Sequence, residues 1–506
     1  MTCATRLLAL AAGAGCVLAF APFEMPLVNV AALSGLFLLW SSADTPRAAA
    51  WIGFFFGVGL FGVGTSWVYI ALETFGAMPA PVAVLATAVF VTCSSLWTAL
   101  AGWTAVRLTP GQGVGRLLAA AAAYTLCEWL RSYLFTGFPW LAMGYAELPS
   151  SGGLPFAGYA PTGGVFLVSM VVASSAAAIA GITTAVAESR RRHVVAWLGS
   201  IAVLAAAGAL QSRMEWTRSE GAPVAISLLQ GNISQAQKFD PSFRPRNREI
   251  YDQLVRSARG RIVVMPESAY AEFADEIPGE VFARLASEAS TRNGIVLAGL
   301  FIAEPPLRPG GEERIYNSVV GLDASTPQLY RKRHLVPFGE TIPFKPVAGW
   351  FINQVLQIPL ADQTAGPLDQ PPFNAAGQKV AVNICYEDAF GQELIAAARA
   401  ANMLVNVTND GWYGHSIAAR QHNQIAAMRA LETGRPMLRA TNSGITSAID
   451  HHGRVISELP WFERGILELN VEGRAGETPY LRFGDWPALI LALLLLAVAA
   501  LYGRNR

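Results

Sequence analysis

Long apolar runs and short alternating runs divide this chain into two regions. Before residue 212 the sequence consists mainly of apolar stretches, each close to the roughly 20 residues that cross a bilayer core. From about Ala222 onward, short β-branched runs alternate with helical patterns. We therefore expect an α-helical membrane bundle that carries an α/β layered domain.

The apolar runs predict eight transmembrane helices, seven before the α/β region and one after it. We expect them at about residues 5–22, 26–42, 49–72, 80–107, 115–135, 160–187, 193–211 and 485–503. The first run continues to Phe20 without a small-x-small cleavage site, so it predicts a retained helix rather than a signal peptide. The predicted domains are a seven-helix region at 1–211, an α/β domain at 212–476, and a final helix with its tail at 477–506.

Arginines in the short connections predict how these helices are oriented. One side of the predicted bundle receives Arg6, Arg47, Arg107, Arg116, residues 190–192, Arg504 and Arg506, whereas the other side receives Arg131 alone. Basic loops stay in the cytoplasm. Residues 212–484 are therefore expected on the opposite side, which in a bacterium is the periplasmic face of the inner membrane.

Composition agrees with this division. Charged residues make up 14% of the chain, against about 25% in an average soluble protein, and residues 1–210 contain only fourteen of them. The net charge of +1 argues against nucleic acid as the main partner. No Cys or His spacing is typical of a metal site, and His451 and His452, which precede Gly453, predict a turn between strands.

Glu128 and Arg131 are ionisable residues inside the fifth predicted helix. They are three positions apart, so they can face each other on one side of a helix. Charges inside membrane helices are costly, and such pairs often serve only to pack helices together. Two interpretations stay open, a structural ion pair and one wall of a lipid headgroup pocket.

The α/β region predicts nine strands and four helices. The strands are expected at 224–229, 261–265, 294–300, 317–322, 379–384, 403–407, 446–449, 455–459 and 465–469, and the helices at 248–257, 278–291, 392–400 and 417–433. Polar residues follow three of these strands, namely Glu267, Cys385, and the pair Asn409 and Asp410. Because sites in α/β sheets form beyond the carboxyl ends of strands, these residues are a candidate constellation.

Cys385 is the only cysteine of the α/β region, because the other four lie in the apolar part of the chain. A free cysteine is often simply a small buried hydrophobic residue. Here, however, the predicted strand stops at Cys385, and Tyr386 begins a turn or a helix. A thiol at a helix N-terminus has a lowered pKa, so the alternative interpretation is an activated nucleophile.

Lys332 and Glu267 are candidates for the other groups that a nucleophilic thiol needs. Four lysines stand against thirty-three arginines, so a lysine within a basic run suggests a place that requires a compact cation. Lys332 is either a solvated surface residue or a cation beside a developing oxyanion. Glu267 is either a surface acid or helix cap, or the general base for the thiol.

The motifs around these three residues resemble the nitrilase superfamily. They lie at 265–268, 330–340 and 383–388, with Glu267, Lys332 and Cys385 in that order. With the predicted helices, and with motifs at 136–140, 230–233, 408–414 and 429–432, nearly the whole chain is similar to the bacterial apolipoprotein N-acyltransferase family. One departure is Phe239, where members of this family often have tryptophan.

The resemblance implies an α-β-β-α sandwich with a catalytic triad of Glu267, Lys332 and Cys385. It implies that the thiol takes the sn-1 acyl chain of a phospholipid, typically phosphatidylethanolamine. The thioester then passes that chain to the α-amino group of a diacylglyceryl-cysteine at the start of an apolipoprotein. Supporting roles are implied for Glu340, Tyr386, Glu387, Phe239, Asn409 and Trp412. We expect a monomer without a cofactor.

An apolar insertion at 347–360 completes the set of candidate features. It contains Trp350, Phe351 and Leu356, and it is either a mobile lid where acyl chains enter or an internally packed segment. The triad also fits a membrane-tethered nitrilase-type amidohydrolase, which is the alternative function. A transporter or receptor with a degenerate domain is disfavoured, because the whole triad is present.

Overall fold

The computed structural model describes residues 2–150, 153, 155–342 and 362–504. The chain forms two compact units. The first comprises residues 1–74, 78–215 and 478–506, and the second comprises residues 75–77 and 216–477.

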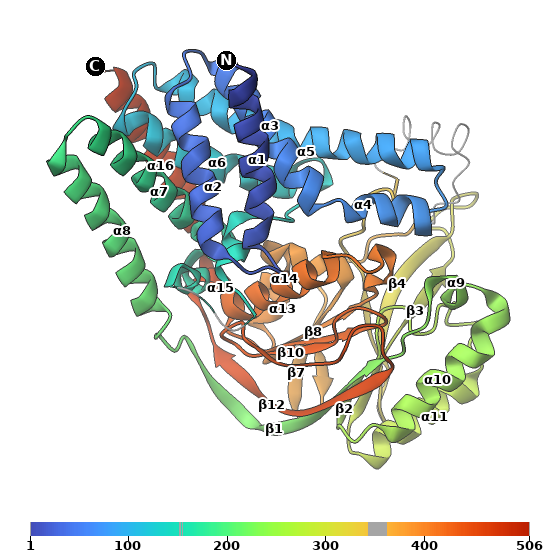
Figure 1. The fold of residues 1–506 in the computed structure, drawn as a ribbon. Coiled ribbons are helices and arrows are strands. Elements are labelled where there is room, and N and C mark those ends of the chain that lie inside the picture. The colour runs from blue at the N-terminus through green and yellow to red at the C-terminus, as the bar shows by residue number, and fades with distance from the viewer. Residues whose placement is uncertain (1, 151–152, 154, 343–361, 505–506) are drawn as a thin grey trace. The chain divides into compact units, whose positions relative to one another are not determined.

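Helices make up the first unit, and each of the eight predicted apolar runs overlaps one of them (Figure 1). They are α1 (Cys3–Cys16), α2 (Pro26–Ser41), α3 (Pro46–Gly64), α5 (Ala80–Leu108), α6 (Val114–Tyr133), α7 (Ala160–Ala187), α8 (Arg191–Gln211) and α16 (Trp486–Arg504). Two short helices, α4 (Trp67–Ile70) and α15 (Pro479–Phe483), belong to the same unit.

Four helical stretches of the described residues have both the length and the apolar composition to cross a membrane. They are Pro46–Gly64, Ala80–Leu108, Pro155–Ala187 and Arg191–Gln211. Three shorter apolar helices lie at Cys3–Ala19, Pro26–Ser41 and Trp486–Tyr502. The fifth predicted span, α6, belongs to neither group and carries Arg116, Glu128 and Arg131. Length and composition therefore support four of the eight predicted spans.

Glu128 and Arg131 bind the backbone of a segment that follows α6. Glu128 Oε1 accepts a hydrogen bond from the N–H of Met143 at 2.8 Å. Arg131 Nη1 donates to the carbonyl oxygens of Phe138 and Trp140, the latter at 2.8 Å. Backbone polar groups away from water need internal partners. The two side chains supply such partners, which favours a structural role for both.

The second unit contains two six-stranded mixed sheets. Their strand orders are β12-β1-β2-β3-β4-β5 and β11-β10-β9-β8-β7-β6. In each sheet three successive strands are parallel, β1 to β3 in one and β7 to β9 in the other. The strands are β1 (Thr217–Gln230), β2 (Ile262–Val264), β3 (Ile295–Glu304), β4 (Arg314–Leu322), β5 (Gln328–Arg331), β6 (Phe373–Ala375), β7 (Gln378–Ile384), β8 (Met403–Thr408), β9 (Met437–Thr441), β10 (Ser447–Ile449), β11 (Val455–Glu458) and β12 (Gly465–Gly476).

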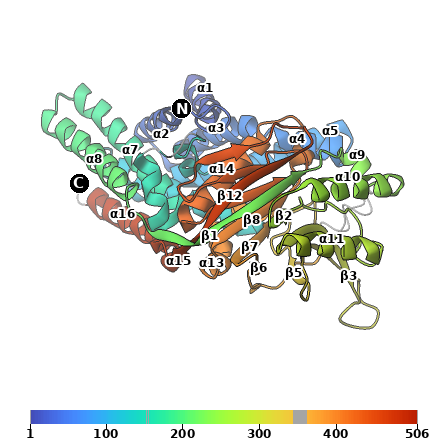
Figure 2. The same ribbon diagram turned by 90° about the horizontal axis from the view of Figure 1, so that it is seen from below.

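Helices cover each sheet of this unit on one face. The helices α10 (Arg244–Ser257) and α11 (Gly279–Thr291) pack on the first sheet, where Leu254, Val263 and Leu285 share one buried core. The helices α13 (Gly391–Arg399) and α14 (Ala418–Thr433) pack on the second sheet (Figures 1 and 2). The resulting order of layers is the predicted α-β-β-α sandwich.

The sequence pattern did not predict three of the strands, β5, β6 and β9. The strands β5 and β6 are short, and neither has a long apolar run. The strand β9 contains Arg439, whose side chain is fully buried. An arginine interrupts the apolar run that identifies a buried strand, so β9 has no local signature.

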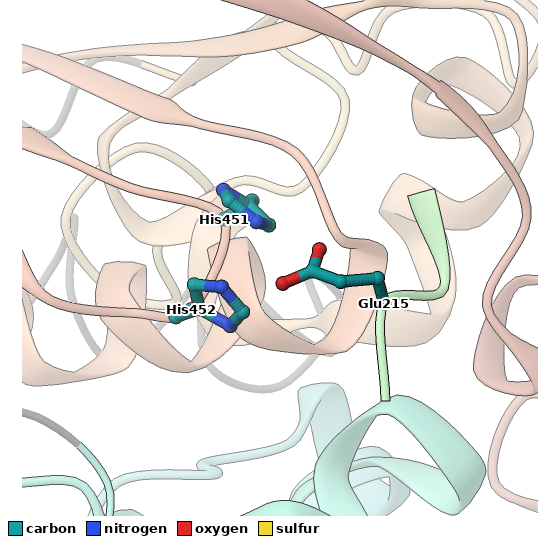
Figure 3. A group of neighbouring side chains, drawn as sticks. All are labelled: Glu215, His451 and His452. Atoms are coloured by element: carbon teal, nitrogen blue, oxygen red, sulfur yellow. The ribbon is translucent and has the colours of Figure 1, made fainter. Parts of the chain in front are cut away.

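His451 and His452 occupy the predicted turn, between the antiparallel strands β10 and β11 (Figure 3). Their ring centroids are 4.0 Å apart. Asp450 Oδ1 accepts the backbone N–H of His452 at 2.9 Å. Gly453 closes the turn with φ 76°, a conformation that glycine adopts without steric cost.

The helices α1 and α3 approach each other closely through glycines. A Cβ atom on Gly13 would lie 2.0 Å from the carbonyl oxygen of Phe56, and one on Gly59 would lie 2.1 Å from that of Leu10. Small residues allow helix backbones to come this close in apolar bundles. A Cβ atom on Gly15, also in α1, would meet no described atom within 4 Å.

Replacing Gly13 by valine should force α1 away from α3. Overpacking of a close contact costs about 1–3 kcal/mol, so Gly13→Val is expected to lower the midpoint of thermal unfolding in detergent. The matched control Gly15→Val places the same side chain in open space and should unfold close to wild type. Equal midpoints for the two variants would contradict the close contact.

Candidate active site

Glu267, Lys332 and Cys385 lie together in the second unit. Glu267 follows β2 and Lys332 follows β5 in the first sheet, whereas Cys385 follows β7 in the second. Lys332 Nζ lies 3.4 Å from Glu267 Oε1. The exposed fractions of the three residues are 6%, 1% and 5%, so this cluster is shielded from solvent. The fold thus gathers a carboxylate, an ammonium and a thiol from both sheets.

Lys332 is held between two carboxylates. Its Nζ donates to Glu340 Oε1 at 2.7 Å, in addition to its contact with Glu267. Glu340 Oε2 in turn accepts the N–H of Val336 at 2.9 Å. Burial alone would lower the pKa of Lys332, but Glu340 and Glu267 outweigh burial and raise the pKa above its ordinary value. The two carboxylates therefore favour the charged form of Lys332.

The expectation of a lowered pKa for Cys385 is wrong. Burial raises the pKa of this thiol well above its ordinary value, Glu267 raises it further, and Lys332 opposes both effects. The helix that begins at Cys385 is only the short 3₁₀ turn η8 (Cys385–Ala389), so its weak dipole cannot offset desolvation of a thiolate. The raised pKa favours the neutral thiol at Cys385, and Glu267 is the carboxylate with the largest influence on that pKa.

Glu387 connects the turn at Cys385 to the chain around Lys332. Its Oε2 accepts the N–H of Ile384 at 2.6 Å and the hydroxyl of Tyr330 at 2.9 Å. Its Oε1 accepts the N–H of Arg333 at 2.6 Å. Burial raises the pKa of Glu387, while the backbone donors lower it. These contacts tie the second sheet to the first at the site.

The remaining predicted supporting residues belong to the same unit as this cluster. Asn409 is buried, and its Nδ2 donates to Gln235 Oε1 at 2.7 Å. Tyr386 is buried, directly after the thiol. Phe239 and Trp412 are 42% and 37% exposed, with ring centroids 5.8 Å apart. An aromatic pair therefore exists without an indole at position 239.

The predicted lid residues Trp350, Phe351 and Leu356 lie within 343–361, outside the described residues. The lid therefore stays a prediction from sequence.

Lys238 is a buried residue of this site that the motifs did not reveal. It ends α9 (Gln235–Lys238), and its Nζ donates to the carbonyl oxygen of Glu267 at 2.8 Å. Burial lowers its pKa to about 8, although Glu267 and Cys385 raise it. The scarcity of lysine could have identified it, because the argument for Lys332 applies to Lys238 as well.

Asn317 is a second buried residue of the site that the motifs did not reveal, and it links Glu267 to Lys332. Its Nδ2 donates to Glu267 Oε1 at 2.8 Å, and its carbonyl oxygen accepts the N–H of Lys332 at 2.8 Å. It lies in β4 and is buried. A polar residue at the start of the predicted strand 317–322 was the available signal.

Removing the Asn317 amide should impair the deprotonation of Cys385. Without this donor, Glu267 is oriented by Lys332 alone, so Asn317→Ala is expected to slow alkylation of Cys385 by iodoacetamide roughly tenfold near neutral pH. The rate is measured by mass spectrometry of the peptide that contains Cys385. Ser318→Ala is the control, because that hydroxyl donates to the Tyr316 carbonyl oxygen at 3.3 Å and not to Glu267. Equal rates for the two variants would refute this role of Asn317.

Known proteins resemble both parts of the chain. The family model described as apolipoprotein N-acyltransferase N-terminal domain matches residues 12–178, and the carbon-nitrogen hydrolase model matches residues 206–480. A solved amidase of the nitrilase superfamily from Nesterenkonia AN1 aligns at 18% identity and TM-score 0.34, over 52% of this chain and 94% of that one.

Curated relatives match over nearly the full length. The protein named apolipoprotein N-acyltransferase from Nitrosomonas europaea is 45% identical over 98% of this chain and 98% of its own length. The protein of the same name from Methylococcus capsulatus is 42% identical over 96% of this chain and 93% of its own. This chain is therefore an acyltransferase that belongs to the apolipoprotein N-acyltransferase family.

Proposed function

We propose that this enzyme transfers an acyl chain from a membrane phospholipid to the N-terminal amine of the diacylglyceryl-cysteine of apolipoproteins. Family membership supports the reaction class. The observation that carries the mechanism is the buried cluster of Cys385, Glu267 and Lys332, with Lys332 Nζ 3.4 Å from Glu267 Oε1. A neutral thiol beside a carboxylate and an ammonium has a base and an electrostatic partner for an oxyanion.

In the first step, Glu267 takes the proton of the Cys385 thiol while the sulfur attacks the ester carbonyl carbon of the phospholipid. Lys332 stabilises the negative oxygen of the tetrahedral intermediate. The carbon–oxygen ester bond then breaks, and Glu267 returns the proton to the departing alkoxide of the lysophospholipid. The product is a thioester on Cys385. We take the sn-1 chain of phosphatidylethanolamine as the donor.

In the second step, the acceptor amine attacks the thioester carbonyl carbon. Glu267 takes the proton that the amine releases and returns it to the departing sulfur of Cys385. The carbon–sulfur bond breaks as the amide bond forms, so the enzyme is restored and the lipoprotein carries three acyl chains. Two chemical steps through one covalent intermediate give ping-pong kinetics.

We place the protein in the bacterial inner membrane with eight crossings and with the α/β unit on the periplasmic side. The arginine bias of the short loops supports this orientation. The four long apolar helices support insertion, and the three shorter ones and α6 would complete the bundle. We propose a monomer that uses no cofactor, with residues 347–360 as the lid over the acyl-chain entrance.

A nitrilase-type amidohydrolase is the alternative, because the same three residues can hydrolyse a carbon–nitrogen bond. The curated relatives and the apolar helices favour acyl transfer from a lipid. The two reactions differ in their products. A hydrolase releases a free acid from an acyl-enzyme, whereas a transferase gives lysophospholipid and an amide.

Intact-mass analysis of the purified enzyme with phosphatidylethanolamine tests the thioester. Wild type should gain the mass of one acyl chain, and an acceptor peptide with a diacylglyceryl-cysteine should remove it. Cys385→Ala should show no adduct, and Cys385→Ser should react at least roughly 100-fold more slowly, because an alcohol is a weaker nucleophile. The matched control is Cys93→Ala in α5, which removes an exposed thiol and should keep the adduct. Absence of the adduct on active wild type would refute the mechanism, and release of free fatty acid without amide product would favour the hydrolase.

A further inference from the structure

Four fully buried charged side chains lie next to the turn that carries Cys385. They are Asp388 in η8, Asp410 in η9 (Asp410–Tyr413), His422 in α14 and Arg439 in β9, each at most 2% exposed. His422 contacts both carboxylates, with Nε2 2.9 Å from Asp388 Oδ1 and Nδ1 2.7 Å from Asp410 Oδ1. Arg439 Nη1 donates to Asp388 Oδ2 at 2.7 Å, and its Nη2 lies 3.6 Å from Asp410 Oδ2. These four residues are named the buried quartet.

The contacts within the buried quartet favour its charged state. Burial alone would lower the pKa of His422, but Asp388 and Asp410 outweigh burial and Arg439, and they raise the pKa to about 9. Burial would raise the pKa of Asp410, yet His422 and Arg439 hold it below its ordinary value. Two carboxylates, one imidazolium and one guanidinium cancel in charge, and buried charges are tolerated when they are paired in this way.

The buried quartet is attached to the backbone of the thiol. His422 Nε2 lies 3.3 Å from the carbonyl oxygen of Cys385, and Asn406 Nδ2 donates to the same oxygen at 3.0 Å. Cys385 has φ 54°, a left-handed conformation that residues other than glycine seldom adopt. Such a conformation persists only where the surroundings hold it, and it clusters at functional sites. The two donors anchor the peptide unit that sets the direction of the Cys385 side chain.

We propose that His422 is a positioning residue for the nucleophile, and that the buried quartet anchors the Cys385 carbonyl so that the thiol stays directed at Glu267 and Lys332. His422 acts through the backbone and touches no reacting atom. The inference rests on the proposed function only through the role of Cys385 as the nucleophile. If the buried quartet were purely structural, it would stabilise the second unit, but the reactivity of the Cys385 thiol would not depend on the protonation of His422.

The protonation of His422 gives this link a definite sign. Because the pKa in the folded protein is raised to about 9, the stabilisation is complete below the ordinary histidine value of about 6.5 and is lost as the pH rises through 9. Above that pH the neutral imidazole keeps a single N–H, so it can no longer donate to both Asp388 and Asp410, and the anchor of the Cys385 carbonyl is weakened. Cys385 acylation should then fall on the alkaline side, whereas ionisation of the thiol by itself would make it rise.

His422→Gln in the full chain in detergent micelles tests the inference. Two rates are measured on the Cys385 peptide from about pH 6 to about pH 10.5, single-turnover acylation by phosphatidylethanolamine and alkylation by iodoacetamide. Wild-type acylation should fall roughly tenfold per pH unit above about pH 9. The variant should be roughly 100-fold slower near neutral pH, with no such fall and with unchanged half-saturation by the lipid.

His415→Gln is the matched control, since His415 is an exposed residue just before α14 that stacks on Phe462, with ring centroids 3.7 Å apart. It should behave as wild type.

A folded His422→Gln variant with wild-type rates and pH profile would overturn the inference. If that variant does not fold, the pH profile of acylation decides. Acylation of wild type that still rises at high pH overturns the inference, and an alkaline fall that persists in Lys238→Gln supports it, because Lys238 has a pKa of about 8 in the same site. If iodoacetamide alkylates the wild type but phosphatidylethanolamine never acylates it, the proposed function is refuted. In that case, slower alkylation of His422→Gln than of wild type would still support the inference about His422.

Discussion

The ion cluster of Lys332 with Glu267 and Glu340 is the interaction on which the site depends. An ammonium that is 1% exposed has lost its hydration, and it stays charged only because two carboxylates are close to it. Glu340 belongs to the chain that follows Lys332, whereas Glu267 follows β2. The cluster therefore holds a loop against the sheet and orients the carboxylate beside Cys385 by the same contacts.

The same constraint governs buried charge elsewhere in the chain. In the first unit, Glu128 and Arg131 bind backbone groups of Phe138, Trp140 and Met143. In the second unit, the buried quartet is formed by two carboxylates, an imidazolium and a guanidinium around one turn. In both cases ionisable side chains lie where an irregular or left-handed backbone needs hydrogen-bond partners that helices and sheets do not provide.

Burial also determines how the proposed chemistry would begin. The thiol of Cys385 is neutral because desolvation outweighs the attraction of Lys332. A neutral thiol requires a base at the moment of attack, which gives Glu267 a role in the proposed transfer that an already ionised cysteine would not need. A site shielded from water also protects a thioester from hydrolysis, which suits transfer between two lipids.

The sequence by itself determined the division into apolar and α/β regions and most strands and helices, and it singled out Glu267, Lys332 and Cys385, which the fold brings together. These features depend on local periodicity and on motifs a few residues long. Only the tertiary structure decided that β9 is a strand in spite of Arg439, that Lys238 and Asn317 contact Glu267, and that the pKa of Cys385 is raised. Each of these outcomes depends on neighbours far apart in the chain, because hydrogen-bond partners and desolvation arise only when distant segments pack together.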